Sequence, residues 1–406
     1  MTEFIDGGVC APEGFTANGI CCGIKKGRET NDIAVILSEK SCEAAALFTR
    51  NTVKAEPVKL TKKHIADGIA RAVIANAGNA NACTGAQGYE NAERTAAAAA
   101  RQLNLDPEDV LVCSTGVIGQ QINIEAIERG MPGLCASVSK EGHRAAREAI
   151  MTTDTRHKEA AVKTEIGGKT VIIGTMAKGS GMIHINMGTM LAFITTDCAI
   201  SASMLDSALR ESAEKTYNCI SIDGDTSTND TLIIMANGLA GNNPISEKNE
   251  DYHRFMAALN ELNTVMAKRI AADGEGAEHL IECSVLGASD DSAARNLAKT
   301  VISSSLVKAA FFGRDANWGR ILCAMGYSGE SFTQEKTSVF FSSAAGEIEV
   351  FHEGIPVCFN ENMAKDILSE DAVTIIIRLE DGSGSGTAWG CDLTYKYVEI
   401  NGDYRT

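Results

Sequence analysis

The sequence lacks an apolar run long enough to cross a membrane and a basic segment that could open a secretory signal. A transmembrane helix needs about 20 consecutive, mostly apolar residues, and no run among the 406 residues approaches that length. The first eight residues, Met-Thr-Glu-Phe-Ile-Asp-Gly-Gly, contain neither a basic region nor an apolar core. We therefore expect no membrane segment and a cytoplasmic location.

Clusters of basic residues are also absent. The chain has 53 acidic and 37 basic residues, a formal net charge of −16, and no basic run longer than Lys-Lys-Gly-Arg at 25–28. Binding to a phosphate backbone needs clustered lysine and arginine. The composition therefore argues against a nucleic acid partner. An anionic substrate would need positive charge supplied locally by its binding site.

The thirteen cysteines include no C-x-x-C pair, and an odd number cannot all pair within one chain. We therefore expect thiols and no metal site. Cys113, which follows Val-Leu-Val, is typical of a cysteine that packs as a small apolar side chain. The glycine-rich residues 382–386 precede Trp389 and a strand pattern, and residues 178–181 lack the order of a phosphate-binding loop. No nucleotide or other cofactor is expected.

Short apolar and β-branched runs alternate with helical patterns along the whole chain. They predict strands at 33–37, 72–74, 110–112, 171–173, 191–194, 231–235, 280–286, 338–341, 347–351, 373–379 and 394–400. Helices are predicted at 91–103, 203–217, 251–272 and 292–311. Between 124 and 151 we expect a short helix, a break at Gly130, Pro132 and Gly133, and a longer helix. The fold class is thus mixed α/β (α+β), with sheets packed with helices around a large core.

The Gly188–Thr189 bond joins a glycine-rich segment to the apolar run that begins at Met190. The surrounding sequence is Lys178-Gly-Ser-Gly-Met-Ile-His-Ile-Asn-Met-Gly-Thr189-Met-Leu. Thr189 can be an ordinary strand residue or a nucleophile. The second role needs a base beside the hydroxyl, and the α-amine freed by a break before Thr189 would supply one, with a reference pKa near 8.

This segment resembles the self-cleavage site of the glutamate N-acetyltransferase family, also called ornithine acetyltransferase. Six further segments match the family in the same order, which is far more specific than one short motif. They are Gly-Phe-Thr-Ala-Asn-Gly at 14–19, Asn-Ala-Gly-Asn-Ala-Asn-Ala-Cys-Thr-Gly at 76–85, Ser-Thr-Gly-Val-Ile-Gly at 114–119, Asp-Gly-Asp-Thr-Ser-Thr-Asn-Asp-Thr at 223–231, Asp-Gly-Glu-Gly-Ala at 273–277 and Asp-Ala-Asn-Trp-Gly-Arg-Ile at 315–321. The terminal Ile-Asn-Gly-Asp-Tyr-Arg-Thr at 400–406 matches as well.

The resemblance implies a self-processing fold of two chains, 1–188 and 189–406, assembled as a heterotetramer of two of each. It implies transfer of an acetyl group from N-acetyl-ornithine to glutamate through an acetyl-threonine on Thr189, in arginine biosynthesis and without a cofactor. The family's usual proline and alanine are replaced here by Ile185 and Gly188. We expect Ile185 to loosen the turn and slow the cleavage. Glycine before the threonine occurs within the family.

The resemblance also assigns residues to roles. Thr115 and Gly116, in a turn after the strand at 110–112, would stabilise the oxyanion, and a glycine there allows close approach of the backbone. The substrate would be bound by Thr152, Lys178, Thr189, Glu275, Asn401 and Thr406. Thr153 is an alternative to Thr152. We infer that Glu275 pairs with the δ-ammonium of acetylornithine and Lys178 with the α-carboxylate that ornithine and glutamate share.

Three alternatives remain open at this point. An amidase or aminopeptidase with a self-generated amino-terminal threonine would use water in place of glutamate. A noncatalytic binding protein could keep the fold, although the nucleophile, oxyanion and substrate positions are all retained. The residues also leave open whether acetyl-CoA is a second acetyl donor, which separates bifunctional from monofunctional family members.

Overall fold

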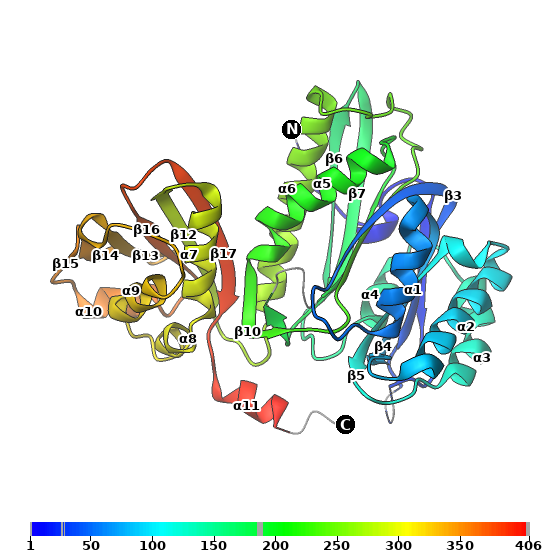
Figure 1. The fold of residues 1–406 in the computed structure, drawn as a ribbon, viewed down its shortest axis with the longest axis horizontal. Helices are drawn as coiled ribbons and strands as arrows, with labels where there is room; N and C mark the ends of the chain where they lie inside the picture. The colour runs from blue at the N-terminus through cyan, green and yellow to red at the C-terminus, as the bar shows by residue number, and fades with distance from the viewer. Residues whose placement is uncertain (1, 26, 28, 185–189, 403–406) are drawn as a thin grey trace.

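The protein consists of two β-sheets flanked by helices, as a computed structural model describes for residues 2–25, 27, 29–184 and 190–402 (Figure 1). A nine-stranded sheet forms the lobe that contains the N-terminus. An eight-stranded sheet forms the second lobe with α7 to α10. Helix α6, Glu250–Ala272, packs against β6 and β7 of the first sheet and against β10, β12 and β17 of the second, so it joins the two lobes.

The nine-stranded sheet has the order β1-β6-β7-β9-β11-β3-β4-β5, with β2 paired to β3. Its strands are β1 Glu3–Ile5, β2 Phe15–Ile20, β3 Ile33–Phe48, β4 Ile69–Asn79, β5 Val110–Val117, β6 Lys158–Ile166, β7 Lys169–Lys178, β9 Leu191–Thr196 and β11 Thr231–Ala236. Strands β9 and β11 lie in the middle of this sheet and are buried along their full length. Their continuous apolar sequences are typical of strands covered on both faces.

The eight-stranded sheet has the order β15-β14-β13-β16-β12-β17-β10-β8. Its strands are β8 Ile183–His184, β10 Ile220–Thr226, β12 Leu280–Ala288, β13 Ser338–Ser343, β14 Gly346–His352, β15 Ile355–Pro356, β16 Ala372–Arg378 and β17 Gly384–Cys391. The chain leaves the first sheet at the end of β7, enters the second at β8 and is back in the first at β9. The predicted cleavage bond falls in this return path, and Ile185, Gly188 and Thr189 lie outside the described residues.

The remaining helices flank the two sheets. They are α1 Glu56–His64, α2 Gly85–Leu103, α3 Ile124–Ala136, α4 His143–Ala149, α5 Ala202–Lys215, α7 Asp291–Ser303, α8 Ser305–Phe312, α9 Trp318–Gly326, α10 Glu361–Ile367 and α11 Tyr395–Asn401. Helices α1 and α2 pack beside β5, whereas α5 packs on β3 and α6. Helix α7 packs on β12 and β17. None of the helices in the described part of the chain is long and apolar enough to span a membrane.

One large buried cluster runs through both lobes. It includes Val162 and Ile194 of the first sheet, Ile270 of α6, and Ile281 and Ile377 of the second sheet. Truncating a fully buried isoleucine in such a core typically costs about 2–5 kcal/mol. Residues from before and after position 188 therefore share one core, which would hold the two predicted chains together.

The predicted mixed class is confirmed, and ten of the eleven predicted strands lie within observed strands or overlap them closely. The helices predicted at 203–217 and 251–272 correspond to α5 and α6. Helix α6 ends with Asp273 as its C-cap, directly before Gly274, as expected for a helix stopped by glycine. Helix α2 begins six residues before its predicted start.

The strand predicted at 394–400 is wrong, because these residues form helix α11. Tyr395 and Val398 have high β-propensity, but their side chains are 78% and 68% exposed. Strand β17 ends at Cys391, and α11 pairs with neither sheet. Without a neighbouring strand, β-propensity has no ladder to join.

The predicted helix breaks are displaced as well. Helix α3 continues through Pro132, and the break falls at 137–142. Packing of α3 on α2 and on the loop around Cys22 overrides the local signal, and the helix comes so close there that a Cβ at Gly130 would lie 2.8 Å from that of Cys22. The helix predicted at 292–311 is two helices, because Ser304 has an extended backbone and its side chain caps α8 at Val307.

Two loop predictions also need correction. The turn predicted at Thr115 and Gly116 is part of β5, which continues to Val117 in parallel pairing with β4. The glycine-rich residues 382–386 are only partly a loop, since β17 begins at Gly384. A Cβ at Gly386 would lie 2.5 Å from the backbone nitrogen of Arg295, so the glycine allows this strand to pass close to α7.

Candidate active site

Lys178 lies at the end of β7, where the nine-stranded sheet meets the path to the second sheet. Its side chain is buried, with 5% of the residue exposed, and its Nζ lies 3.4 Å from Thr115 Oγ1. Lys178 pairs in register with Leu191 of β9. Met190 is buried beside it, and its carbonyl accepts a hydrogen bond from the Thr231 N–H at 3.0 Å. The first described residues after the predicted cleavage bond therefore lie next to the Lys178 backbone in the sheet.

Gly116, the second predicted oxyanion residue, has a backbone that only glycine accommodates well. Its φ is +132°, and a Cβ there would lie 2.4 Å from the carbonyl carbon of Gly78 in the neighbouring strand. The amide of Asn229 donates to the carbonyls of Ser114 at 2.7 Å and Ala80 at 2.6 Å. The backbone around Thr115 and Gly116 is thus held from two sides, as a preorganised oxyanion site requires.

Asp154 connects two of the predicted substrate-binding residues through its buried carboxylate. It accepts hydrogen bonds from the Thr152 N–H at 3.1 Å and from the Gly179 N–H, next to Lys178, at 2.7 Å. It also accepts from Lys158 Nζ at 2.7 Å. Burial alone raises the pKa of Asp154, but the charges of Lys178 and Lys158 together with these hydrogen bonds lower it to about 2. The carboxylate is therefore charged at neutral pH.

Lys158 extends this network to Asp273 at the end of α6. Its Nζ binds both Asp154 and Asp273, and only 1% of its side chain is exposed. Asp273 also accepts from the N–H groups of Thr155 at 3.0 Å and Arg156 at 3.2 Å. A buried cation between two carboxylates satisfies charges that would be costly alone. The network thereby fixes the 152–156 loop against the loop that carries Glu275.

Glu275 lies against the glycine turn that follows Lys178. A Cβ at Gly181 would lie 2.3 Å from the carboxyl group of Glu275, so this carboxyl group packs directly against the Gly181 backbone. The Glu275 N–H donates to the Ser180 carbonyl at 3.0 Å, and the Ser180 hydroxyl donates to the Asp273 carbonyl at 2.6 Å. Glu275 is 8% exposed and forms no salt bridge with any residue in the described ranges. A buried carboxylate of this kind suits a cationic ligand group.

Helix α11 contacts this turn through two residues four positions apart. Asn401 Nδ2 donates to Glu275 Oε2 at 2.7 Å, and the Tyr397 hydroxyl donates to Asp223 Oδ2 at 3.4 Å. Asp223 in turn accepts from the Met182 N–H and from the Ile183 N–H, the latter at 2.8 Å. Residues spaced by four share one helix face. The helix thus places Asn401 next to Glu275.

The structure brings together most of the predicted site residues that it describes. Lys178 contacts Thr115, and Glu275 contacts Asn401. Thr152 joins Lys178 only indirectly, through Asp154, and both Thr152 and Thr153 are half-buried. Thr189, Gly188 and Thr406 lie outside the described residues. No group of three or more histidine, cysteine, aspartate or glutamate side chains in the described ranges could hold a metal ion.

Sequence reasoning assigned no role to several residues that hold the site together. These are Asp154, Lys158, Asp223, Asn229 and Asp273. Asp223, Asn229 and Asp273 lie inside segments that were singled out as motifs, whereas Asp154 and Lys158 do not. Buried polar residues inside a motif were thus the available signal, but which groups they bind depends on contacts between distant parts of the chain.

A mixed α and β fold with buried charged side chains around a glycine turn is typical of an enzyme. The chain belongs to the ArgJ family, whose model matches residues 16–406. It is 47% identical over its full length to the arginine biosynthesis bifunctional protein ArgJ of Caldanaerobacter subterraneus subsp. tengcongensis, and 49% identical to that of Symbiobacterium thermophilum, again over 100% of both chains. The predicted family and enzyme class are confirmed.

A solved structure agrees with this assignment. The crystal structure of the arginine biosynthesis bifunctional protein ArgJ from Bacillus halodurans shares 46% identity with this chain and a TM-score of 0.51. The match covers 53% of this chain and 99% of the solved chain. The predicted fold type is confirmed, and the solved chain is about half as long as this one.

Proposed function

We propose that the enzyme transfers an acetyl group from N2-acetyl-L-ornithine to L-glutamate through an acetyl-threonine on Thr189, with acetyl-CoA as a second donor. One observation carries the proposal. The buried Lys178 directly precedes the glycine turn at 179–181, and the buried carboxylate of Glu275 packs against Gly181 of the same turn. A cation and an anion beside one turn suit a substrate that carries an α-carboxylate and a δ-ammonium.

Self-cleavage would prepare the nucleophile. The Thr189 hydroxyl attacks the Gly188 carbonyl, the peptide nitrogen leaves as the Thr189 amine, and water hydrolyses the resulting ester to a Gly188 carboxylate. The products are chains 1–188 and 189–406. The half-length of the solved Bacillus halodurans chain supports this division, because residues 189–406 make up just over half of the 406.

The transfer would then proceed in two balanced steps. The Thr189 amine accepts the hydroxyl proton while the oxygen attacks the acetyl carbonyl of acetylornithine, and ornithine leaves with that proton on its amine. The glutamate amine next attacks the acetyl ester, and the threonine oxygen recovers a proton as N-acetylglutamate leaves. Thr115 and Gly116 would stabilise the oxyanion in both steps, and Lys178 beside Thr115 adds positive charge there.

The two chains would assemble further after cleavage. We infer a heterotetramer of two chains of each kind in the cytoplasm. The core shared by residues before and after position 188 supports chains that stay together after cleavage. Size-exclusion chromatography with light scattering on the mature protein should give a mass of about four chains, whereas a mass of two chains would contradict the tetramer.

Denaturing mass spectrometry of the mature protein tests the cleavage. It should show two chains, one ending at Gly188 and one beginning at Thr189. Thr189→Ala should give one uncut, inactive chain, whereas Thr153→Ala should still be cut. Cut and active Thr189→Ala would exclude Thr189 as the nucleophile.

The acetyl acceptor distinguishes this enzyme from an amidase or aminopeptidase, which would use water in place of glutamate. Acetylornithine incubated with glutamate should give N-acetylglutamate and ornithine in equal amounts, with little ornithine when glutamate is absent. Equal ornithine release with and without glutamate would favour the hydrolase. Incubating acetyl-CoA and glutamate without acetylornithine tests the second donor.

A further inference from the structure

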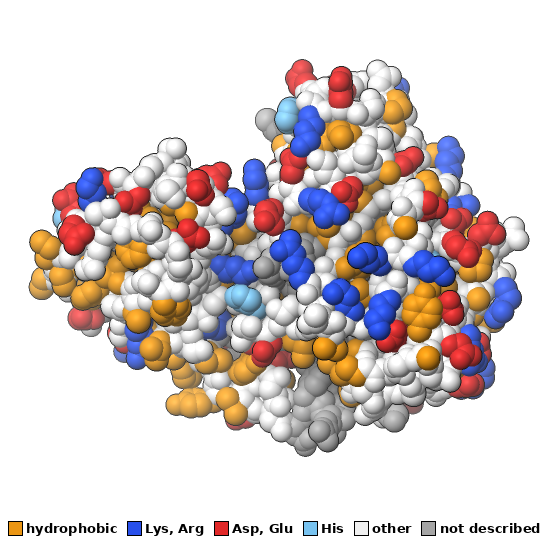
Figure 2. All heavy atoms as spheres, viewed as in Figure 1, with side chains coloured by type: hydrophobic (Ala, Val, Ile, Leu, Met, Phe, Trp, Pro, Cys, Tyr) orange, Lys and Arg blue, Asp and Glu red, His pale blue; other side chains and the backbone are white. Residues whose placement is uncertain are grey.

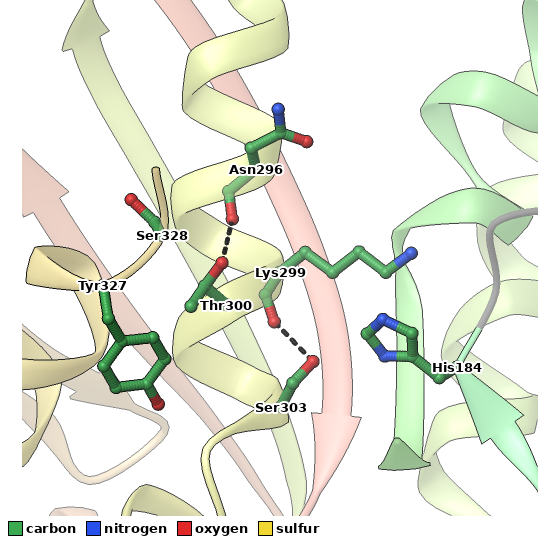
Figure 3. A pocket seen from close by; sticks show the side chains of 7 residues that line it. All are labelled: His184, Asn296, Lys299, Thr300, Ser303, Tyr327 and Ser328. Carbon is green, nitrogen blue, oxygen red and sulfur yellow. Dashed lines mark hydrogen bonds between the residues drawn. The ribbon is translucent and has the colours of Figure 1, made fainter. Parts of the chain in front are cut away.

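A cavity of about 480 Å³ lies beside β8 and helix α7, and neither Lys178 nor Glu275 lines it. It is open to solvent and lined by polar side chains from β8, from α7 and from the residues after α9, and Figure 3 shows the Lys299 side chain extending from α7 towards His184. Its lining includes His184, Asn296, Lys299, Thr300, Ser303 and Tyr327. This volume is within the usual range of small-molecule sites.

The chemistry of the lining favours an anion. Among the described residues that line the cavity, Lys299 supplies a positive charge and none carries a carboxylate. Burial lowers the pKa of Lys299 to about 8, with the charge of Glu214 opposing the shift, so the ammonium is mostly protonated at pH 7. Burial and the charge of Lys299 lower the pKa of His184 to about 4, so its imidazole is neutral and bonds Ser221 Oγ at 3.0 Å through Nδ1.

The hydroxyl groups of α7 are mainly committed to the helix itself. Thr300 donates to the Asn296 carbonyl at 2.8 Å and Ser303 to the Lys299 carbonyl at 2.6 Å, as Figure 3 shows. Lys299, the His184 ring and the Tyr327 phenol also line the cavity and carry groups that can donate to a ligand. An ammonium acts as a point charge that suits phosphate oxygens, whereas planar carboxylates are matched best by the arginine fork.

The cavity is close to the active site along the chain. Gly181 touches Glu275, the N–H of Ile183 is held by Asp223, and His184 reaches the cavity. Three extended residues span about 10 Å. Figure 2 shows lysine and arginine side chains gathered at the junction of the lobes and across the nine-stranded lobe, although the net charge of the chain is −16.

We propose that this cavity binds a phosphate group, and that the phosphate belongs to coenzyme A when acetyl-CoA is the donor. The coenzyme carries its phosphates and its thioester at opposite ends of a flexible arm. Phosphates held at Lys299 would let the arm follow β8 towards the site at Glu275 and Lys178. The coenzyme A assignment rests on the proposed function, whereas phosphate binding at the cavity does not.

Calorimetric titration of the mature enzyme with coenzyme A, and separately with sodium phosphate, tests the proposal. Lys299→Met should weaken coenzyme A binding about tenfold or more, because a charge-assisted contact is lost. Lys299→Arg should retain most of the affinity. Lys365→Met, which removes the same charge from the exposed face of α10, is the matched control and should bind as the wild type does.

Kinetics separate the cavity from the catalytic site. In Lys299→Met the KM for acetyl-CoA should rise about tenfold, while exchange between acetylornithine and glutamate stays unchanged and shows that the variant is folded. If neither coenzyme A affinity nor phosphate affinity changes in Lys299→Met, the proposal is overturned. If phosphate binding is lost while coenzyme A affinity stays unchanged, only the coenzyme A assignment is overturned. Coenzyme A that binds through Lys299 without donating acetyl would support the cavity and overturn only the second donor of the proposed function.

Discussion

Asn401 donates a 2.7 Å hydrogen bond to Glu275, and this contact joins the C-terminal helix to the loop that follows α6. The two residues are 126 positions apart. Because the amide reaches a carboxylate that is already packed against Gly181, it limits the directions in which Glu275 can point. The carboxylate is thereby positioned for a cationic substrate group.

Asn401→Ala should weaken the binding of acetylornithine. A hydrogen bond to a charged group contributes about 1.5–3 kcal/mol, so we expect its KM to rise about tenfold or more with a smaller change in kcat. Steady-state kinetics with acetylornithine measure this. Asn362→Ala on the exposed part of α10 is the control and should leave KM unchanged. A lower kcat at constant KM would contradict a role in substrate binding.

Gly116→Ala should impair both folding and catalysis. The new Cβ would lie 2.4 Å from the carbonyl carbon of Gly78, at a φ of +132° that side chains rarely adopt. Displacing an oxyanion donor lowers kcat by about 10²–10³-fold. Gly133→Ala is the matched control, because its Cβ meets nothing within 4 Å in α3 and should stabilise the helix by about 0.5–1 kcal/mol. A kcat of Gly116→Ala equal to that of the wild type would show that Gly116 does not stabilise the oxyanion.

Asp154→Asn should destabilise the protein by about 3 kcal/mol or more, because it leaves Lys158 with one carboxylate and Lys178 without its buried counter-charge. Thermal unfolding measures the loss. Asp206→Asn breaks an exposed pair with Arg210 on α5 and should change stability by less than about 1 kcal/mol. Equal effects of the two substitutions would mean that the buried network contributes little.

Acid should destabilise the protein through the same carboxylate. The pKa of Asp154 is lowered to about 2 in the folded protein, against an ordinary value of 3.8. Its contribution is therefore fully present above about pH 4 and is lost as the pH falls towards 2, on the order of 2 kcal/mol in total. Urea unfolding at pH 5, 4 and 3 should show the loss, and Asp154→Asn should show less of it. An unchanged pH dependence in that variant would exclude Asp154 as its source.

Several elements were predictable because their signals are local. The buried strands around 191–194 and 231–235 have continuous apolar sequences, and α6 has a cap at each end. Helix α11 was not predictable, since Tyr397 and Val398 favour a strand wherever a partner is present. Ser304 likewise divides α7 from α8 through a cap that residue patterns alone did not indicate.

The residues of the candidate site likewise divide into those that short segments of sequence indicate and those that only tertiary contacts reveal. Residue types and their order along the chain determined the family, the predicted nucleophile and the predicted partners Lys178, Glu275 and Asn401, because their chemistry is carried by short segments. Only the tertiary structure decided that Asp154, Lys158 and Asp273 connect these segments, since Asp273 lies 115 positions from Lys158 and 118 from Thr155, and Asp154 lies 25 positions from Gly179. Their burial removes water from competing for the charges, and this makes a network that sequence spacing does not indicate.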